Sequence, residues 1–115
     1  MASSKAATNK IDDTYALILY DIGLDGCING VYRGPNSEVY VELLRKKAGA
    51  TNIGDGLFSI YRNQYIDTAG THTGWVTVKP QKGGYIFEWY QKKGVLDFRG
   101  IGYKMNERQI AVYYH

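Results

Sequence analysis

Residues 83–104 read GGYIFEWYQKKGVLDFRGIGYK, and this stretch decides the fold. Successive side chains of a β-strand point to opposite faces, so Phe87 and Trp89 share one face of a strand. In the segment that follows, Gly100 and Gly102 alternate in the same way and leave one face without side chains. Large rings on one strand and glycines on the next indicate two neighbouring strands that fit each other.

A hairpin that turns at Lys93-Gly94, where glycine provides a positive φ, brings the rings and the glycines together. It pairs Trp89 with Phe98, Phe87 with Gly100 and Tyr85 with Gly102, and on the other face Glu88 with Arg99. Glycines on an inner face make room for rings and let a strand bend, as the closure of a small barrel requires. We therefore expect the rings of this inner face, including that of Phe98, to fill the interior of a barrel.

The rest of the chain repeats the pattern of strand and turn. Runs rich in Tyr, Val, Ile, Phe and Trp alternate with short segments rich in Gly, Asn and Asp. The runs are residues 15–22, 28–33, 38–44, 57–65, 75–79, 85–91, 95–103 and 109–114. Short turns join antiparallel neighbours, because a parallel pair needs a long crossover. The sequence predicts an all-β fold, an antiparallel meander closed into a small barrel of about eight strands.

Residues 38–48 fit two kinds of secondary structure. Val39, Leu43 and Leu44 have helical spacing, and Gly49 follows as a stop signal. The run Val39-Tyr40-Val41 favours a strand instead, because β-branched and aromatic residues prefer extended backbone. We favour the strand, and the helix remains the alternative.

The length of 115 residues fits one domain. We interpret residues 1–12 as a flexible polar tail and residues 13–115 as a single β-barrel domain. The one cysteine, Cys27, cannot form an internal disulfide, and the longest apolar run, YALILY, is far shorter than the ~20 residues of a membrane helix. No signal peptide is visible, so we expect a cytoplasmic protein with no membrane contact.

Several motifs occur in a recognisable order along the chain. An NG-x-Y strand start at residues 29–32 is followed by GWVTV, GYIFEWY, FRGIGYK and QIAVYY. This order resembles the small calycin-like or avidin-like β-barrel domains found in many bacterial proteins, and the likeness is best over residues 74–114. The resemblance implies an up-and-down barrel that is either filled or able to hold a ligand, with no agreed activity.

No catalytic or metal-binding motif stands out. The glycine-rich segments match neither a P-loop nor a dinucleotide fingerprint, and no Cys or His pair has the spacing of a zinc site. We expect the four acids Glu42, Asp67, Glu88 and Asp97 to be charges on the outer face. His72 lies in GTHTG, a loop by composition. We therefore predict a protein that is not an enzyme, with no catalytic residues, no cofactor and no metal.

Arg62 is the residue that suggests a function. Phe58 and Ile60 share a strand face with Arg62, so inward apolar residues would place the guanidinium inside the barrel, near one end. A buried guanidinium needs a partner, and an anionic ligand is one. The leading hypothesis is a barrel that binds a small molecule, with Arg62 favouring an anion. Its predicted ligand-binding residues are Arg62, Phe58, Tyr85 and Trp89.

Two other functions remain open. Ile86, Tyr90 and Ile101, and Tyr61 with Tyr65, could form an apolar patch on the outer face and serve a protein-interaction or oligomerising module. Single-stranded nucleic acid is the third candidate, and we expect weak binding or none. The net charge is only +3, the lysines gather at turns, and buried rings cannot stack on bases.

Overall fold

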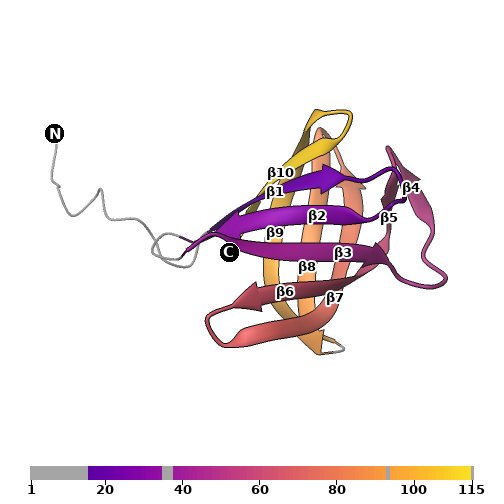
Figure 1. Ribbon diagram of the computed structural model, residues 1–115. Coiled ribbons are helices and arrows are strands. Elements are labelled where there is room, and N and C mark those ends of the chain that lie inside the picture. Colours follow the sequence, from indigo (N-terminus) through magenta and orange to yellow (C-terminus); the bar gives the residue numbers. More distant parts are fainter. Residues whose placement is uncertain (1–15, 35–37, 93, 115) are drawn as a thin grey trace, which may run out of the picture.

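The computed structural model describes residues 16–34, 38–92 and 94–114, which form strands and turns. The strands are β1 (Ala16–Ile22), β2 (Ile28–Arg33), β3 (Tyr40–Lys46), β4 (Asn52–Gly54), β5 (Leu57–Phe58), β6 (Ile60–Asp67), β7 (Gly70–Gln81), β8 (Gly84–Lys92), β9 (Val95–Asn106) and β10 (Gln109–Tyr114). Eight of them close a barrel in the order β1-β10-β9-β8-β7-β6-β3-β2, with every pair antiparallel (Figure 1). The predicted all-β barrel is therefore confirmed. The predicted polar tail, residues 1–12, lies outside the described residues.

The hairpin of β8 and β9 has the predicted register. Phe87 pairs with Gly100, Tyr85 with Gly102, Trp89 with Phe98 and Glu88 with Arg99. Beyond Trp89 the register shifts, so the strands depart from regular pairing towards their turn. The aromatic strand and the glycine strand are thus neighbours, as their alternation indicates.

The interior of the barrel is apolar and packed. Its buried side chains are Ile18, Tyr20, Ile22, Ile28, Leu44, Leu57, Tyr61, Val76, Val78, Tyr85, Phe87, Trp89, Ile110 and Val112. They come from every barrel strand except β9, whose inner face carries Gly100 and Gly102. Phe98, expected inside, pairs with Trp89 as predicted but is 39% exposed, because this pair lies near the end of the barrel.

Residues 40–46 form strand β3 and no helix. This strand pairs with β2 on one side, where Val41 opposes Val31, and with β6 on the other. The backbone N–H and C=O groups of β3 therefore bond to two neighbouring strands, whereas in a helix they would bond within the segment. The preference for a strand in residues 38–48 is confirmed for the part that forms β3.

A short hairpin of β4 and β5 covers one end of the barrel, which we call the capped end (Figure 1). Asp55 and Gly56 form its two-residue turn with φ of 53° and 78°, the positive values that a type I′ turn requires. Leu57 then inserts into the core with no exposed surface. The sequence predicts only a turn at residues 47–56, so this cap is an addition to the predicted barrel.

The run of residues 57–65 is not one strand. Ser59 separates β5 from β6, and its carbonyl accepts a hydrogen bond of 3.0 Å from the amide of Val78. After this break, Tyr61 and Asn63 point inward and are buried. The placement of Tyr61 and Tyr65 on the outer face is therefore wrong, because both share the inner face of β6 with Asn63.

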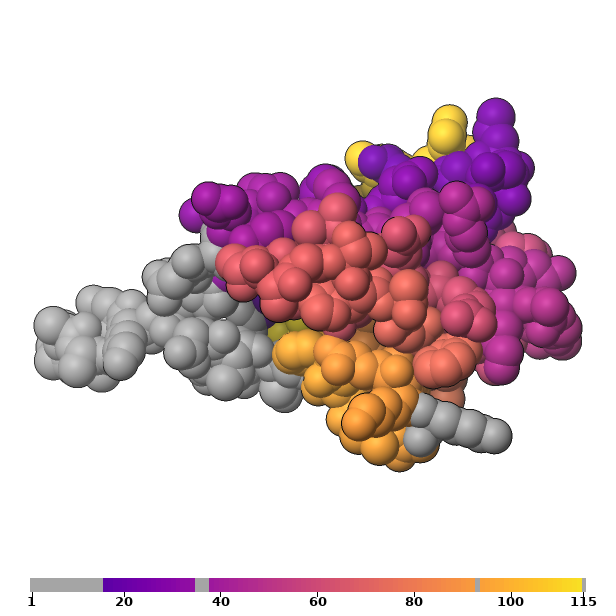
Figure 2. Space-filling model, turned by 60° about the horizontal axis from the view of Figure 1, so that its bottom comes forward, coloured from indigo at the N-terminus to yellow at the C-terminus, as the bar shows by residue number. Residues whose placement is uncertain are grey.

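His72 belongs to strand β7 and not to a loop. The hairpin of β6 and β7 extends beyond the predicted strands, so Tyr65 pairs with His72 and Asp67 with Gly70. Figure 2 looks onto this side of the barrel, with the segment around β4 and β5 at its right-hand end. The described part of the chain has no helix with the length and apolar character needed to cross a membrane.

Candidate functional site

The end of the barrel opposite the cap holds a cavity of about 160 Å³, which we call the mouth cavity. Here β1 begins and β10 ends, and the tips of the β6–β7 and β8–β9 hairpins lie at the same end (Figure 1). The cavity is lined by Ile18, Tyr32, Glu42, Asn63, Tyr65, Asp67, Trp89, Asp97, Phe98 and Tyr114. Seven strands contribute to this lining, so the cavity exists only because the barrel closes.

Glu42 is the buried carboxyl group of the mouth cavity. It lies on the inner face of β3 and is 5% exposed. The hydroxyl of Tyr20 donates a hydrogen bond to Oε1, and Nδ2 of Asn63 donates one of 2.6 Å to Oε2. Both donors are neutral, so neither compensates the charge of an ionised carboxylate.

Burial raises the pKa of Glu42 above its ordinary value, while the hydrogen bonds from Tyr20 and Asn63 lower it in part. The pKa of Tyr20 is raised well above its ordinary value, first by burial and then by the nearby carboxyl of Glu42. The phenol therefore keeps its proton and stays a donor. Among the described residues, the charged form of Glu42 thus has no cationic partner.

Asn63 carries an unsatisfied acceptor beside this carboxyl. Its Oδ1 is buried and has no hydrogen-bond partner within the described part of the chain. A buried carbonyl oxygen without a donor is unfavourable, typically by ~1–3 kcal/mol. Beside Glu42, this oxygen is thus a second acceptor to which the hydrogen-bond donor of a ligand could bind.

Aromatic rings form the walls of the mouth cavity. Trp89, only 6% exposed, lies 5.1 Å from the ring centre of Tyr114, and Tyr114 meets Phe98 edge-on at 5.4 Å. Burial raises the pKa of Tyr114 above its ordinary range and that of Tyr32 to about 12. The phenols of the wall therefore remain neutral.

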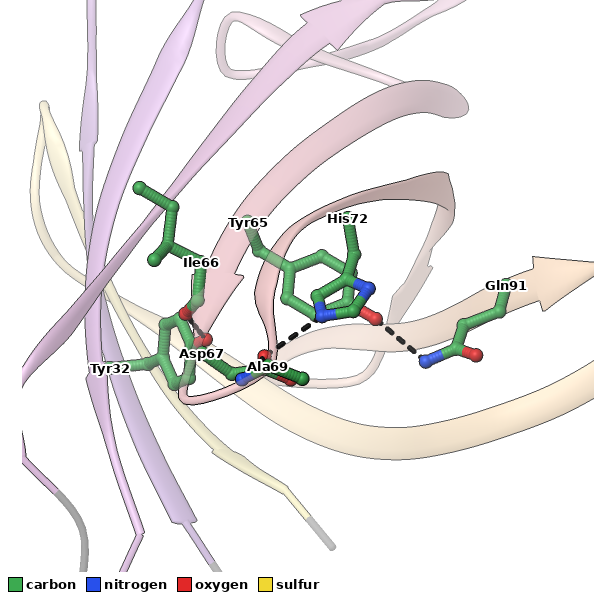
Figure 3. A network of polar contacts seen from close by, with 7 residues as sticks. All are labelled: Tyr32, Tyr65, Ile66, Asp67, Ala69, His72 and Gln91. Carbon is green, nitrogen blue, oxygen red and sulfur yellow. Dashed lines mark hydrogen bonds and ion pairs between the residues drawn. The ribbon is translucent and has the colours of Figure 1, made fainter.

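A polar network fixes the rim of the cavity (Figure 3). Nε2 of His72 lies 2.8 Å from Oδ1 of Asp67, and the His72 ring stacks on Tyr65 with 5.1 Å between ring centres. The Tyr65 hydroxyl accepts a hydrogen bond of 2.6 Å from Nε2 of Gln91. Three strands, β6, β7 and β8, thus hold Tyr65 in one position.

The other rim residues are held in a similar way. The Tyr32 hydroxyl donates to the carbonyl of Ile66, and the amide of Ala69 donates to Oδ1 of Asp67 at 2.8 Å (Figure 3). The hydrogen bond with His72 lowers the pKa of Asp67, whereas burial raises that of Asp97. Asp67 is the more acidic of the two rim carboxyl groups.

The four residues predicted to bind a ligand do not come together. Trp89 lines the mouth cavity, but Tyr85 and Phe58 lie at the capped end, where the Tyr85 hydroxyl donates to Asp55. Phe58 packs partly on the core beneath the ammonium group of Lys46, 4.7 Å from the ring centre. Of the four, only Trp89 borders the cavity.

The inward placement of Arg62 is wrong. Arg62 is exposed on the outer face of β6, and its guanidinium lies 5.2 Å from the centre of the Trp75 ring. Arg62 shares the outer face of β6 with Ile60, because the residues that alternate inward along this segment are Leu57, Tyr61 and Asn63. Arg62 therefore has an aromatic partner outside the barrel.

The prediction that Glu42 lies on the outer face is wrong. Residues 39, 41 and 43 of its segment are Val, Val and Leu, so alternation alone assigns that apolar set to the core. In the structure Val39 and Val41 are exposed and Glu42 faces inward. The signal that distinguishes the two faces is Leu44, which shares the face of Glu42 and pairs with the buried Ile28.

The other three acids have mixed outcomes. Glu88 is on the outer face, where Oε1 lies 3.1 Å from the Lys79 ammonium group. Asp67 and Asp97 lie at the rim of the mouth cavity and not on the outer wall. Within the described residues, no three His, Cys, Asp or Glu side chains lie close enough to hold a metal ion.

Compared with protein-family models, with curated proteins and with solved structures, the chain matches none of them.

Proposed function

We propose that this protein binds a small, positively charged organic molecule in the mouth cavity, without catalysing a reaction on it. The observation that carries the proposal is the Glu42 carboxyl group, buried at the cavity and hydrogen-bonded by the two neutral donors Tyr20 and Asn63. An ammonium group of a ligand would supply the positive charge that an ionised Glu42 lacks. Charge burial is tolerated when such a partner is present.

The charges around the cavity support a cation over an anion. Glu42, Asp67 and Asp97 line it, and its described lining contains no Lys or Arg. Like charges in a partly buried site repel, so a carboxylate or phosphate ligand would be disfavoured. The expectation of an anionic ligand rested on Arg62, which points away from this cavity.

The size and walls of the cavity support a compact head group. A cavity of about 150 Å³ holds a molecule as large as benzene, and the mouth cavity has a volume of about 160 Å³. Trp89, Tyr114 and Tyr65 present rings to it. Aromatic faces attract ammonium groups by ~0.5–2 kcal/mol each, so methylated ammonium groups fit this chemistry.

Two expectations from the sequence are consistent with this proposal. The resemblance to calycin-like barrels is consistent with a ligand inside the barrel. A cytoplasmic location is consistent with the single cysteine, which cannot form an internal disulfide. We rank nucleic-acid binding lowest, because Phe87 and Trp89 are 0% and 6% exposed and their rings cannot stack on bases.

Isothermal titration calorimetry with three compact probes of similar size tests the proposal. The probes are tetramethylammonium chloride, the neutral tert-butanol and the anionic pivalate. We expect binding of tetramethylammonium alone, weakened at least about tenfold in Glu42→Gln. Preference for pivalate, or no heat from any probe at millimolar concentrations, would overturn the proposal.

A control variant separates this site from the outer face. Arg62→Ala removes a cation that lies over Trp75 outside the barrel, so the affinity for tetramethylammonium should not change. The affinity should also rise with pH as Glu42 loses its proton, because the carboxylate is the charged partner. Loss of binding in Arg62→Ala would show that the ligand lies elsewhere.

A further inference from the structure

One side of the barrel wall is apolar on the outside as well as on the inside. Six large apolar side chains point outward from β9, β1, β2 and β3, and each is between 41% and 64% exposed. These strands are neighbours in the barrel, with β10 between β9 and β1. The six side chains are Leu17, Leu19, Val31, Val41, Ile101 and Tyr103. We call these six residues the apolar outer face.

Strand pairing shows that this face is continuous. Leu19 lies opposite Val31 on one side and Ala111 on the other, Val31 opposes Val41, and Ala111 opposes Tyr103. One uninterrupted row therefore crosses five neighbouring strands. With about 4.8 Å between strands, the row is about 19 Å long.

The opposite wall has a different character. There the outward positions of β6, β7 and β8 include Arg62, Lys79 and Glu88, and the last two form an ion pair of 3.1 Å. Scattered apolar residues are ordinary on protein surfaces, but a continuous patch confined to one side of a barrel is not. The apolar outer face is thus a distinct surface.

We propose that the apolar outer face is the interface of a homodimer, in which the faces of two copies of this chain pack against each other. Its six side chains present on the order of 600 Å² of apolar surface. A standard interface buries about 800 Å² on each partner, and roughly 55–65% of it is apolar. The exposed apolar area is thus what one partner of a stable dimer requires.

The charges at the two ends of this face favour a second copy over an unrelated partner. The last outward residue of β1 is Asp21, and the last outward residue of the neighbouring β2 is Arg33. Because the two strands are antiparallel, these residues lie at opposite ends of the barrel. A two-fold axis across the strands reverses their direction, so Arg33 of each copy approaches Asp21 of the other. The face is therefore self-complementary in charge.

The chain's own N-terminal segment is a poorer occupant. Residues 1–12 read MASSKAATNKID and contain only two large apolar side chains, Met1 and Ile11. Such a segment offers little apolar surface to cover six exposed residues. A second barrel, which presents an equal apolar face, matches the area.

Sedimentation velocity of the full chain, from low micromolar to millimolar concentration, tests the proposal. We expect a monomer–dimer equilibrium. Leu19→Lys should weaken it on the order of 100-fold, because it places a charge at the centre of the interface. The matched control is Thr73→Lys, which places the same charge at an exposed outward position of β7, across the barrel from β1, and should leave dimerisation unchanged. Circular dichroism checks that both variants fold.

The charge pair gives a sharper test of the two-fold arrangement. Asp21→Lys and Arg33→Glu should each weaken dimerisation, and the double variant should restore it, because the cross-subunit attraction is reversed and not removed. A monomer at every concentration would overturn the proposal. So would equal weakening by Thr73→Lys, or dimerisation that appears only after deletion of residues 1–12.

Discussion

Gly102 lies directly against the ring of Phe87 inside the barrel. A Cβ atom at this glycine would be 2.8 Å from Cε1 of Phe87 and 3.0 Å from Cγ2 of Val112. Phe87 has no exposed surface, so its ring cannot move away into solvent. The absence of a side chain at position 102 is therefore a packing requirement, because interiors at this density do not absorb an extra methyl group freely.

Gly102→Ala should destabilise the protein by about 1–3 kcal/mol, the range for overpacking of a tight core. Urea unfolding followed by circular dichroism measures this loss. In a Phe87→Leu background the same substitution should cost less, because the smaller side chain leaves the colliding position. An equal loss in both backgrounds would show that the ring of Phe87 is not the obstacle.

The β8–β9 hairpin was predictable because its pattern has one solution. Phe87 and Trp89 need space, and Gly100 and Gly102 provide it at matching positions. The same reasoning failed for Arg62, because both faces of its segment carry large apolar side chains: Phe58 and Ile60 on one face, Leu57 and Tyr61 on the other. Alternation shows which residues share a face, but it does not show which face is inside when both are apolar.

The mouth cavity was less predictable, for a physical reason that concerns β3. Val39 and Val41 make the outer face of this segment as apolar as its inner face, so hydrophobicity does not place Glu42. Tyr32, Tyr65 and Tyr114 reach the cavity from strands far apart in the sequence. The cap was more predictable from the sequence, because Asp55-Gly56 is a strong signal for a hairpin turn.

Glu42 should make stability fall with rising pH. Burial raises its pKa, so the folded state holds a proton that the unfolded state releases above about pH 4.5. The free energy of unfolding should therefore decrease from that pH until the pH passes the pKa of Glu42 in the folded state, and then level off. The total decrease is about 1.4 kcal/mol for each unit by which the folded and unfolded pKa values differ.

Subtracting the profile of Glu42→Gln isolates this contribution, because Asp97 titrates with the same sign and Asp67 with the opposite sign in both proteins. Rotation of the Asn63 amide would let its unpaired Oδ1 accept a hydrogen bond from the new Gln side chain. Urea unfolding across the pH range provides the data. Parallel profiles for the two proteins would contradict the prediction.

Tyr20→Phe should destabilise the protein more strongly when Glu42 is ionised. The substitution removes the hydroxyl that donates to Oε1 of Glu42 and leaves a buried carboxylate oxygen without that donor. The expected loss is about 1.5–3 kcal/mol near pH 8 and smaller near pH 5, because a hydrogen bond to a charged group is the stronger one. Chemical unfolding at both pH values measures the difference.

Tyr85→Phe is the matched control for this variant. It removes a hydroxyl of the same kind, but the partner of that hydroxyl is Asp55, an exposed residue at the capped end whose carboxylate water can solvate. The loss should be about 1 kcal/mol or less. If the two variants lost equal stability at both pH values, burial of Glu42 would not be the cause.

Leu57→Ala should weaken the cap without changing the mouth cavity. Leu57 has no exposed surface and anchors the β4–β5 hairpin in the core, so its truncation should cost about 2–5 kcal/mol of stability. Leu24→Ala makes the same change at a leucine that is 95% exposed and should cost almost nothing. Thermal unfolding compares the two variants.

Because the cap and the mouth cavity lie at opposite ends of the barrel, the affinity of folded Leu57→Ala for tetramethylammonium should equal that of the unmodified protein. A large loss of affinity would show that the two ends are coupled through the core.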